Sequence, residues 1–392
     1  MNTAVGALDR SRLDAFVADS TRETPYVVVD LDIVRERYQR LATALPAATI
    51  FYAVKANPAP EILALLAELG ACFDVASPGE VDECLALGVS PDRISYGNTV
   101  KKFRDIAYAY DRGVRVFTFD AVGELDKLVS AAPGSTVVCR LACSSEGADW
   151  PLSRKFGTTA GDAAAMLRRA AQLGMRIGVS FHVGSQQRNL HAWDRALEEV
   201  AHVESALAEH GLELDVINLG GGFPGTYRES MPQVEEYGEA INAAVARRVR
   251  NPQRVRFMAE PGRYLVADAG VLCSEVVLVA QRPADGEQRW IYLDVGMFGG
   301  LAETMGEAIR YPIRTDLDGT PSGPVALAGP TCDSADVLYE HTPYELPLAL
   351  APGDRVYFSS TGAYTTSYSS VGFNGFAPLR SYYLAARALT PS

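Results

Sequence analysis

Short apolar segments rich in Val, Ile, Phe and Tyr alternate with longer amphipathic segments along the first two thirds of the chain. The longer segments, such as 61–70, 79–88 and 160–174, have helical periodicity and end in glycine, as helices often do. Eight strands with intervening helices predict a (β/α)8 barrel, although a doubly wound open sheet alternates in the same way. The predicted strands centre on residues 49–54, 72–76, 93–97, 114–119, 136–142, 176–183, 214–219 and 254–259.

The pattern changes after about residue 270, where strand-like segments follow one another with turn residues between them. This succession of strands predicts a second, β-rich domain, and we expect YVVVD (26–30), which precedes the barrel, to join it. We therefore expect an N-terminal segment (1–44) that contributes to the β domain, a barrel (45–270) and a β-sandwich or β-barrel (271–392). The predicted strands of the last domain are VLCSEVVLVAQR, RWIYLDVG, GPVALAG, GDRVYFSS and SYYLAAR.

Unusual polar residues and glycines stand at or just after the ends of the predicted barrel strands. Active sites of such barrels lie at the carboxyl ends of the strands. Residues from this many separate strands therefore predict one shared site. These residues are Lys55, Asp74, Arg140, His182, Gly220, Gly221, Gly222, Glu260 and Arg263.

Each of these features has an ordinary reading beside a functional one. Lys55 is either a lysine that reaches solvent along its own stem or a nucleophilic amine in a dry cleft. The triplet in NLGGGFPG (218–225) is either a tight turn or a cradle of backbone N–H groups for a phosphate. Glu260 and Arg263 alone would be a structural ion pair. Together with the flat imidazole of His182, they describe a ligand with a phosphate, an aromatic ring, a basic ring nitrogen and an aldehyde, which pyridoxal phosphate fits.

Composition narrows the function further. A net charge of −12 argues against a nucleic-acid partner, and no segment has the length of a signal peptide core or a membrane span. The six cysteines contain no CxxC pair, so we expect neither a zinc site nor a disulfide framework. Free thiols fit a reducing cytoplasm.

Eight motifs, in chain order, resemble those of the fold-type III pyridoxal-phosphate decarboxylases of the ornithine, lysine and diaminopimelate family. They are FYAVKAN, FDVAS, SFHVGS, GGGFPG, EPGR, GPTCDSAD, GAYT and FNGF. WPLSRKFG, FGGLAET and SADVLYE are most similar to the bacterial ornithine or lysine/ornithine branch. The resemblance implies an alanine racemase-like barrel with a β domain. It also implies decarboxylation of a basic L-amino acid to its amine and CO2, a role in polyamine synthesis, and a head-to-tail homodimer with shared sites.

The resemblance assigns roles residue by residue. Lys55 would anchor the cofactor, His182 would stack on its ring and Glu260 would keep the pyridine nitrogen protonated. Asp74 and Glu80 would be supporting acids. The phosphate would be held by Ser185, Arg263, Tyr364 and the backbone of Gly220, Gly221 and Gly222, with Arg140 also in the cofactor site.

The substrate residues would come from the β domain of the partner subunit. Cys332 in GPTCD would reprotonate Cα after CO2 leaves, since a thiol is an acid of workable strength. A lone cysteine is ordinarily a small buried apolar residue with a structural role. Because Cys332 lies in the GPTCD motif, the resemblance favours the catalytic role instead. Asp333 would bind the distal amine of the substrate, and Phe373 would line the same pocket.

One position departs from the family pattern. Gly306 in GGLAETMGEAIRYPI stands where ornithine-type relatives carry an aspartate for the distal ammonium. Glu307 or Glu303 would supply the missing charge; otherwise the pocket favours a larger, modified or less cationic amino acid. Two further readings differ in class: an amino-acid racemase, which needs a second acid/base opposite Lys55, and an inactive regulatory paralogue, which needs no full catalytic set.

Overall fold

The computed structural model describes residues 8–150, 155–282 and 288–385. Contacts between Cα atoms divide the chain into two compact units. The first, here the β unit, takes residues 1–36, 225–230 and 265–392; the second, here the barrel unit, takes 37–224 and 231–264. Residues 151–154 of the WPLSRKFG motif and 386–387 of the last predicted strand lie outside the described residues.

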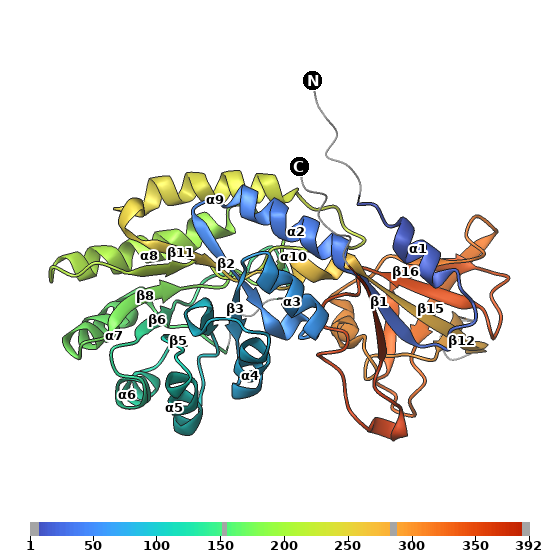
Figure 1. Ribbon diagram of the computed structural model, residues 1–392. Helices are drawn as coiled ribbons and strands as arrows, with labels where there is room; N and C mark the ends of the chain where they lie inside the picture. The colour runs from blue at the N-terminus through green and yellow to red at the C-terminus, as the bar shows by residue number, and fades with distance from the viewer. Residues whose placement is uncertain (1–7, 151–154, 283–287, 386–392) are drawn as a thin grey trace, which may run out of the picture. The chain divides into compact units, whose positions relative to one another are not determined.

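Eight parallel strands of the barrel unit close into a barrel, in the order β10-β11-β2-β3-β4-β5-β6-β8. This confirms the barrel and rules out the open sheet. Figure 1 shows helices α4 to α8 outside these strands. The strands are β2 (Ala48–Ala53), β3 (Cys72–Val75), β4 (Ile94–Tyr96), β5 (Val116–Phe119), β6 (Thr136–Arg140), β8 (Arg176–Ser180), β10 (Val216–Asn218) and β11 (Arg256–Ala259).

The helices between these strands begin and end near the predicted positions. Ser77 caps α4 by accepting the Glu80 N–H, and Thr159 caps α7 by accepting the Asp162 N–H. The longer helices are α2 (Leu31–Ala44), α3 (Pro60–Glu68), α4 (Pro78–Ala86), α5 (Phe103–Asp111), α6 (Val122–Ala131), α7 (Ala160–Gln172), α8 (Ala192–Ala208) and α9 (Val234–Arg248). Short helical segments are η1 (Val54–Ala56), η2 (Pro91–Arg93), η3 (Pro252–Arg254) and α10 (Arg263–Val266).

The barrel strands bury apolar side chains on both faces, which explains why they appear in the sequence as nearly continuous apolar runs. One cluster inside the unit takes a buried residue from each of six strands: Phe51, Cys72, Val116, Val138, Val216 and Met258. Burial of this many large side chains contributes about 1.5–3 kcal/mol each and makes the barrel a rigid support. Polar residues at its strand ends are therefore held in fixed positions.

The β unit is built on one mixed eight-stranded sheet, with the path β14-β17-β12-β13-β15-β16 and with β1 pairing β12 and β18. The strands are β1 (Tyr26–Asp30), β12 (Gly270–Arg282), β13 (Gln288–Leu293), β14 (Ile313–Thr315), β15 (Ser322–Ala328), β16 (Val337–Pro347), β17 (Arg355–Ser359) and β18 (Arg380–Leu384). Its helices are α1 (Ser11–Val17), η4 (Ala267–Ala269), η6 (Ala302–Glu307) and η7 (Phe373–Gly375).

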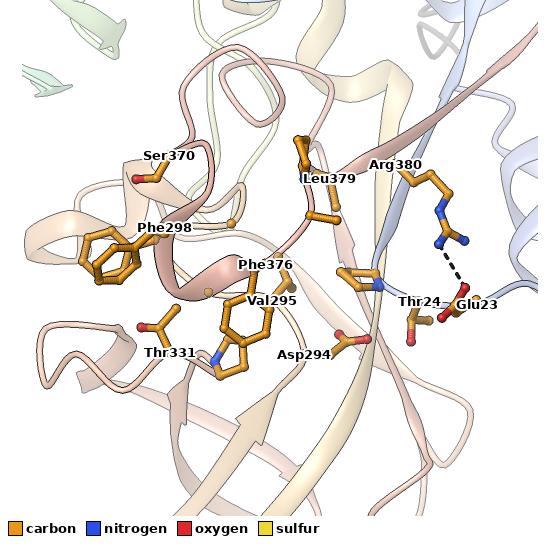
Figure 2. A pocket seen from close by; sticks show the side chains of 17 residues that line it. Glu23, Thr24, Asp294, Val295, Phe298, Thr331, Ser370, Phe376, Leu379 and Arg380 are labelled. Atoms are coloured by element: carbon orange, nitrogen blue, oxygen red, sulfur yellow. Dashed lines mark hydrogen bonds and ion pairs between the residues drawn. The ribbon is translucent and has the colours of Figure 1, made fainter.

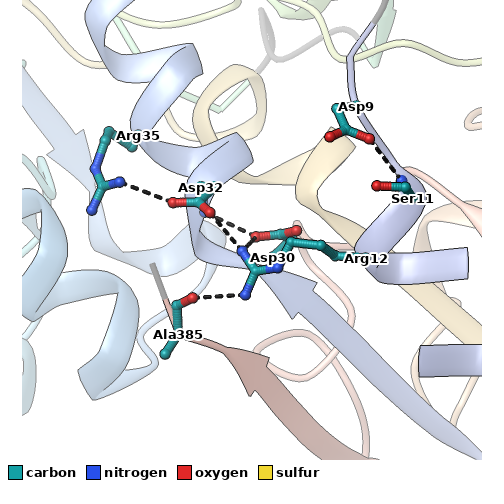
Figure 3. A network of polar contacts seen from close by, with 7 residues as sticks. All are labelled: Asp9, Ser11, Arg12, Asp30, Asp32, Arg35 and Ala385. Atoms are coloured by element: carbon teal, nitrogen blue, oxygen red, sulfur yellow. Dashed lines mark hydrogen bonds and ion pairs between the residues drawn. The ribbon is translucent and has the colours of Figure 1, made fainter. Parts of the chain in front are cut away.

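The N-terminal segment joins this sheet, as predicted for YVVVD. β1 runs antiparallel to β12 and parallel to β18, with Tyr26 opposite Cys273 and Arg380. Figure 3 shows Arg12 of α1 fixing the junction: its guanidinium donates to Asp30 (2.8 Å), to Asp32 (2.6 Å) and to the Ala385 carbonyl (2.7 Å). These charge-assisted bonds tie both ends of the described chain to β1.

Two features were not predicted from the sequence. β7 (Ala148–Trp150) and β9 (Ser185–Gln187) form a separate two-stranded sheet beside the barrel. Residues 225–230, which follow the glycine triplet, belong to the β unit. Among the described helices, none combines the length and apolar character needed to cross a membrane.

Candidate active site

Lys55 lies directly after the first barrel strand, in the short helix η1. Its Nζ is 3.4 Å from Oδ2 of Asp74, which is buried at the end of β3. The Lys55 side chain is 53% exposed, so the amine is not in a dry cleft within this unit. The buried carboxylate of Asp74 is a polar partner that helps to direct Nζ.

Two further contacts hold the acids near Lys55. Gly97, just after β4, leaves room for Asp74, because a Cβ there would overlap the Asp74 carboxylate. Glu80, in the first turn of α4, accepts the Ala76 N–H at 2.6 Å. Burial raises the pKa of Glu80 to about 7, and the nearby Asp74 charge adds to this effect, although the Ala76 hydrogen bond opposes it.

His182 stands two residues after the end of β8 and carries a neutral imidazole. Burial, followed by the positive charges of Arg140 and Lys55, holds the pKa of His182 well below its usual value. Its Nδ1 accepts the Gly184 N–H at 3.1 Å, which a protonated Nδ1 would not do. The ring is therefore a flat, uncharged surface at the barrel mouth.

Glu260 follows β11 and is oriented by a residue that the sequence reasoning missed. Asn218, buried at the end of β10, donates from Nδ2 to Glu260 Oε1 (2.5 Å) and accepts the Gly220 N–H (2.9 Å). Burial and the Asp74 charge raise the pKa of Glu260 to about 8. An acid in this state is stabilised as a carboxylate when a cationic group faces it.

The glycine triplet adopts a backbone that side chains would not allow. Gly220 and Gly222 have φ of +67° and +107°, in the left-handed region that favours glycine. At Gly221 a Cβ would lie 2.5 Å from the Glu260 carbonyl oxygen and 3.3 Å from His182 Nε2. The triplet therefore lies directly against both His182 and Glu260.

A buried cation lies on the same barrel. Arg263, only 3% exposed, donates from Nε (3.2 Å) and Nη2 (3.1 Å) to Ser185 Oγ in β9. A second guanidinium, of Arg140, ends β6 over the Phe156 ring at 5.1 Å. Burial raises the pKa values of both Asp74 and Glu260, and the positive charge of Arg140 offsets part of that rise.

These barrel residues fit the group that the sequence indicates, pyridoxal phosphate. A phosphate needs backbone N–H groups that a ligand can approach closely and a cation, and the triplet and Arg263 provide both. An aromatic ring with a basic nitrogen needs a flat face and an acid, as His182 and Glu260 offer. The side chains and backbone groups at this barrel end are therefore chemically compatible with the cofactor.

The remaining sequence-predicted residues belong to the β unit. Cys332 and Asp333 lie on an exposed turn before β16, and Phe373 starts η7. The Cys332 N–H donates to Asn374 Oδ1 (3.1 Å), and its Sγ is 3.4 Å from the same oxygen. The structure thus brings Cys332 and the FNGF segment together within this unit.

A pocket of about 220 Å³ lies beside these residues, with Phe298, Thr331, Ser370 and Phe376 in its wall (Figure 2). Phe373 also lines it, and its ring centroid is 4.7 Å from that of Phe298. Phe373 therefore lies in the wall of a concave, partly aromatic pocket of the β unit, and its role toward a substrate stays a prediction.

The specificity segment has an unusual backbone. Gly306 and Glu307 in η6 have φ of +60° and +54°, and a Cβ at Gly306 would meet open space. The Glu307 carboxylate accepts the N–H groups of Glu340, His341 and Thr342 at 2.6–2.8 Å and also bonds the Thr342 hydroxyl. Glu303 is buried, with 5% exposure.

Glu307 therefore serves as an anchor for β16. Burial would raise the pKa of its carboxyl, but the bonds from Thr342 and the backbone outweigh burial and lower it.

Tyr364, in the GAYT motif of the β unit, has φ of +56°.

Comparisons with known proteins point to one family. The model of a family described as "Pyridoxal-dependent decarboxylase, pyridoxal binding domain" matches residues 31–267. The chain is 38% identical over 355 residues to a lysine/ornithine decarboxylase of Selenomonas ruminantium, covering 90% of this chain and 88% of that protein. It is 35% identical over 386 residues to an antizyme inhibitor 2 of Xenopus laevis, covering 95% and 83%.

A solved structure agrees with these sequence matches. The crystal structure of a lysine/ornithine decarboxylase from Vibrio vulnificus, complexed with cadaverine, has a TM-score of 0.85 to this chain. Identity is 32%, and the match covers 98% of this chain and 100% of the other. The likeness therefore spans both units.

Proposed function

Because this chain belongs to the pyridoxal-dependent decarboxylase family, we propose that it converts a basic L-amino acid, lysine- or ornithine-like, to the corresponding amine and CO2. The observation that carries the proposal is the grouping of Lys55, His182 and Glu260 at one end of the barrel, against the glycine triplet. The His182 imidazole is neutral, and the Glu260 carboxyl is one that a cationic ring nitrogen facing it would ionise.

Bound pyridoxal phosphate supplies an electron sink for the negative charge left on Cα when CO2 departs. Lys55 would hold the cofactor through Nζ, with Asp74 orienting that atom. Glu260, positioned by Asn218, would keep a proton on the ring nitrogen, where negative charge develops. His182, being neutral, would pack on the ring without repelling that proton.

Phosphate binding would be shared between backbone and side chains. The backbone of Gly220, Gly221 and Gly222 would line the phosphate. The Gly220 N–H is already bonded to Asn218 Oδ1, so the N–H groups of Gly221 and Gly222 would be the donors, with Ser185 and Arg263 in contact with one another beside them. We assign Tyr364 of the β unit to the same phosphate by its GAYT motif. Arg140 would add positive charge to the site.

We further propose a head-to-tail homodimer with two shared sites. Lys55 lies in the barrel unit, whereas Cys332 lies in the β unit. Cys332 and Asp333 of one subunit would complete the barrel site of its partner, Cys332 as the acid and Asp333 as the partner of the distal amine. A monomer is then expected to be inactive.

The preferred substrate depends on η6. Gly306 contributes no carboxylate, and the Glu307 carboxylate is engaged by β16. A distal ammonium would then rely on Asp333, or on a rearranged Glu307 or Glu303. We infer that lysine or ornithine is one candidate and that a larger, modified or less cationic amino acid is the other.

Two other activities are less well supported. A racemase would keep Lys55 and the phosphate site but has no use for Cys332 in GPTCD. An inactive regulator is suggested by the similarity to antizyme inhibitor 2, yet a regulator does not need Lys55, His182, Glu260, Arg263 and Cys332 together. We place the protein in the cytoplasm because its six cysteines are free.

Release of CO2 from a panel of L- and D-amino acids tests the function. The panel includes lysine, ornithine, arginine, diaminopimelate and ornithine derivatives, with pyridoxal phosphate present. We expect turnover by the wild type and none by Lys55→Ala, which should also lose the visible absorption band of bound cofactor. Lys102→Ala, at an exposed lysine before α5, should keep both. A wild type that binds cofactor but releases no CO2 from any substrate would refute the proposal.

A further inference from the structure

Asn374 in η7 has a left-handed backbone conformation, which asparagine tolerates better than most residues. Asn374 has φ of +50° and ψ of +15°, and its neighbours Gly372 and Gly375 are also left-handed, with φ of +77° and +76°. Asparagine is enriched in this region of backbone space because its short polar side chain is compatible with it. The glycines close the turn, and Asn374 is the residue in it that carries a hydrogen-bonding side chain.

The Asn374 amide contacts both the backbone and the thiol of Cys332. Its Oδ1 accepts the Cys332 N–H at 3.1 Å, and Cys332 Sγ lies 3.4 Å from the same oxygen. The two residues are 42 positions apart in sequence, so neither contact follows from local turn geometry. An oxygen that accepts from S–H favours the protonated thiol and fixes the direction of its proton.

The turn that carries Cys332 is anchored from its other side. Asp336, with 2% exposure, accepts the Thr331 N–H (3.2 Å), the Thr331 hydroxyl (2.7 Å) and the Met297 N–H (2.7 Å). Gly296 and Gly329 lie so close to this carboxylate that a Cβ on either would overlap it. Asp336 therefore fixes the backbone before Cys332, and Asn374 fixes the residue itself.

We propose that Asn374 is a positioning residue for Cys332: its side-chain oxygen accepts from the thiol and directs its proton. The inference rests on the proposed function for its catalytic meaning, because Cys332 is there the acid that protonates Cα. A thiol aimed elsewhere would let the proton reach another atom of the substrate–cofactor system. If the proton goes to the cofactor carbon that bears the substrate nitrogen, hydrolysis by water leaves that nitrogen on the cofactor and releases the decarboxylated skeleton as an aldehyde, so CO2 forms without the amine.

The test follows the thiol directly and then the products. In the purified, cofactor-loaded protein, iodoacetamide labelling of the Cys332 peptide is measured by mass spectrometry over a range of pH. Asn374→Asp places a negative charge beside Sγ, so labelling should move to higher pH by about one unit. Asn374→Gly keeps the left-handed turn but removes the acceptor, so labelling should move to lower pH.

Controls separate the local effect from a general one. Cys143, partly buried with its Sγ 3.0 Å from the His182 carbonyl oxygen, reports on the barrel and should label identically in all variants. Asn242→Asp makes the same charge change on an exposed face of α9 and should leave the Cys332 profile unchanged. Cys332→Ser identifies the Cys332 peptide.

The product ratio then tests the catalytic meaning. The wild type should give one amine for each CO2, and Asn374→Gly should give fewer amines than CO2. Unchanged Cys332 profiles in both Asn374 variants would overturn the positioning role. If the profiles shift but the wild type releases no CO2 from any substrate, the contact is established and it is the proposed decarboxylase function that fails.

Discussion

Three acids near the barrel mouth share the same response to burial although their partners differ. Asp74 faces the Lys55 amine, Glu260 accepts from the Asn218 amide, and Glu80 accepts the Ala76 N–H. Burial raises the pKa of each, since a carboxylate loses hydration inside a protein. Burial therefore favours the neutral form of each carboxyl, and a cationic group placed against one of them favours its carboxylate.

Glu80 makes this effect measurable as stability. Its folded-state pKa of about 7 lies above the ordinary 4.5, so the folded protein binds a proton that the unfolded chain has lost. Stability should therefore fall as pH rises from about 4.5 through 7. Glu80→Gln removes this dependence. At pH 8 we expect the free energy of unfolding of the variant to exceed that of the wild type by less than about 3 kcal/mol. The difference stays below that figure because Glu80 is partly exposed and solvent screens its charge.

Urea unfolding of both proteins at pH 5 and pH 8, with saturating cofactor, checks the prediction. The difference between Glu80→Gln and wild type should be larger at pH 8. Glu61→Gln, at an exposed acid in the first turn of α3, controls for loss of one charge. A difference that is equal at the two pH values would contradict the raised pKa of Glu80.

Single residues also mark the limit of sequence reasoning. Lys55, His182 and Glu260 could be located because each follows an apolar run that had to be a barrel strand. Asn218 and Asn374 could not be assigned roles from the sequence, since the partner of each lies 42 residues away and an asparagine at a strand end or in a turn has many ordinary uses. The solvent exposure of Lys55 was also not predictable, because the apolar run locates the strand β2 but does not determine how buried the lysine after it is.

Among the elements, the barrel strands were predictable because burial on both faces makes each one a compact apolar run. β7 and β9 have three residues each and no such run, so they were missed. η6 shows a different limit. The sequence placed Gly306 and Glu307 side by side, but only the fold shows that Glu307 anchors the N–H groups of 340–342.

The role of η6 can be divided between stability and specificity. Glu307→Gln should lower the unfolding free energy by about 1–3 kcal/mol at pH 7, because charged acceptors make stronger bonds to backbone N–H groups. The pKa of Glu307 is lowered in the fold, so this contribution is present above about pH 4.5 and is lost as pH falls below it. Unfolding at pH 7 and pH 3.5 tests both statements.

Gly306→Asp is the companion experiment for substrate choice. Asp tolerates the left-handed backbone, and a Cβ at 306 meets open space, so the variant should fold. If Gly306 has changed the specificity, the variant should gain activity on ornithine or lysine through a lower KM. An unchanged KM for both, with good wild-type turnover, would show that Asp333 or Glu307 already suffices.

At the scale of the whole molecule, the chemistry is divided between two units of the fold. Lys55 belongs to the barrel unit and Cys332 to the β unit. If the sites are shared between subunits, Lys55→Ala and Cys332→Ala chains should complement one another. After random reassortment, half of the dimers are mixed and each has one complete site, so about one quarter of wild-type activity should return.

Mixing the two inactive variants and assaying CO2 release checks this arrangement. The unmixed variants and a mixture of Lys55→Ala with Glu260→Gln, both altered in the barrel unit, are the controls and should stay inactive. Recovery in neither mixture would contradict shared sites, and recovery in both would contradict the assignment of Lys55 and Glu260 to one site.

Reaction in deuterium oxide distinguishes decarboxylation from racemisation and from the absence of any activity. The wild type, loaded with pyridoxal phosphate, is given its best substrate, and CO2, amine and recovered amino acid are analysed together. A decarboxylase that protonates Cα gives equal amounts of CO2 and amine, with one carbon-bound deuterium in each amine molecule. Deuterium at Cα of the recovered amino acid without release of CO2 would show a racemase, and no change in any of the three would show an inactive protein.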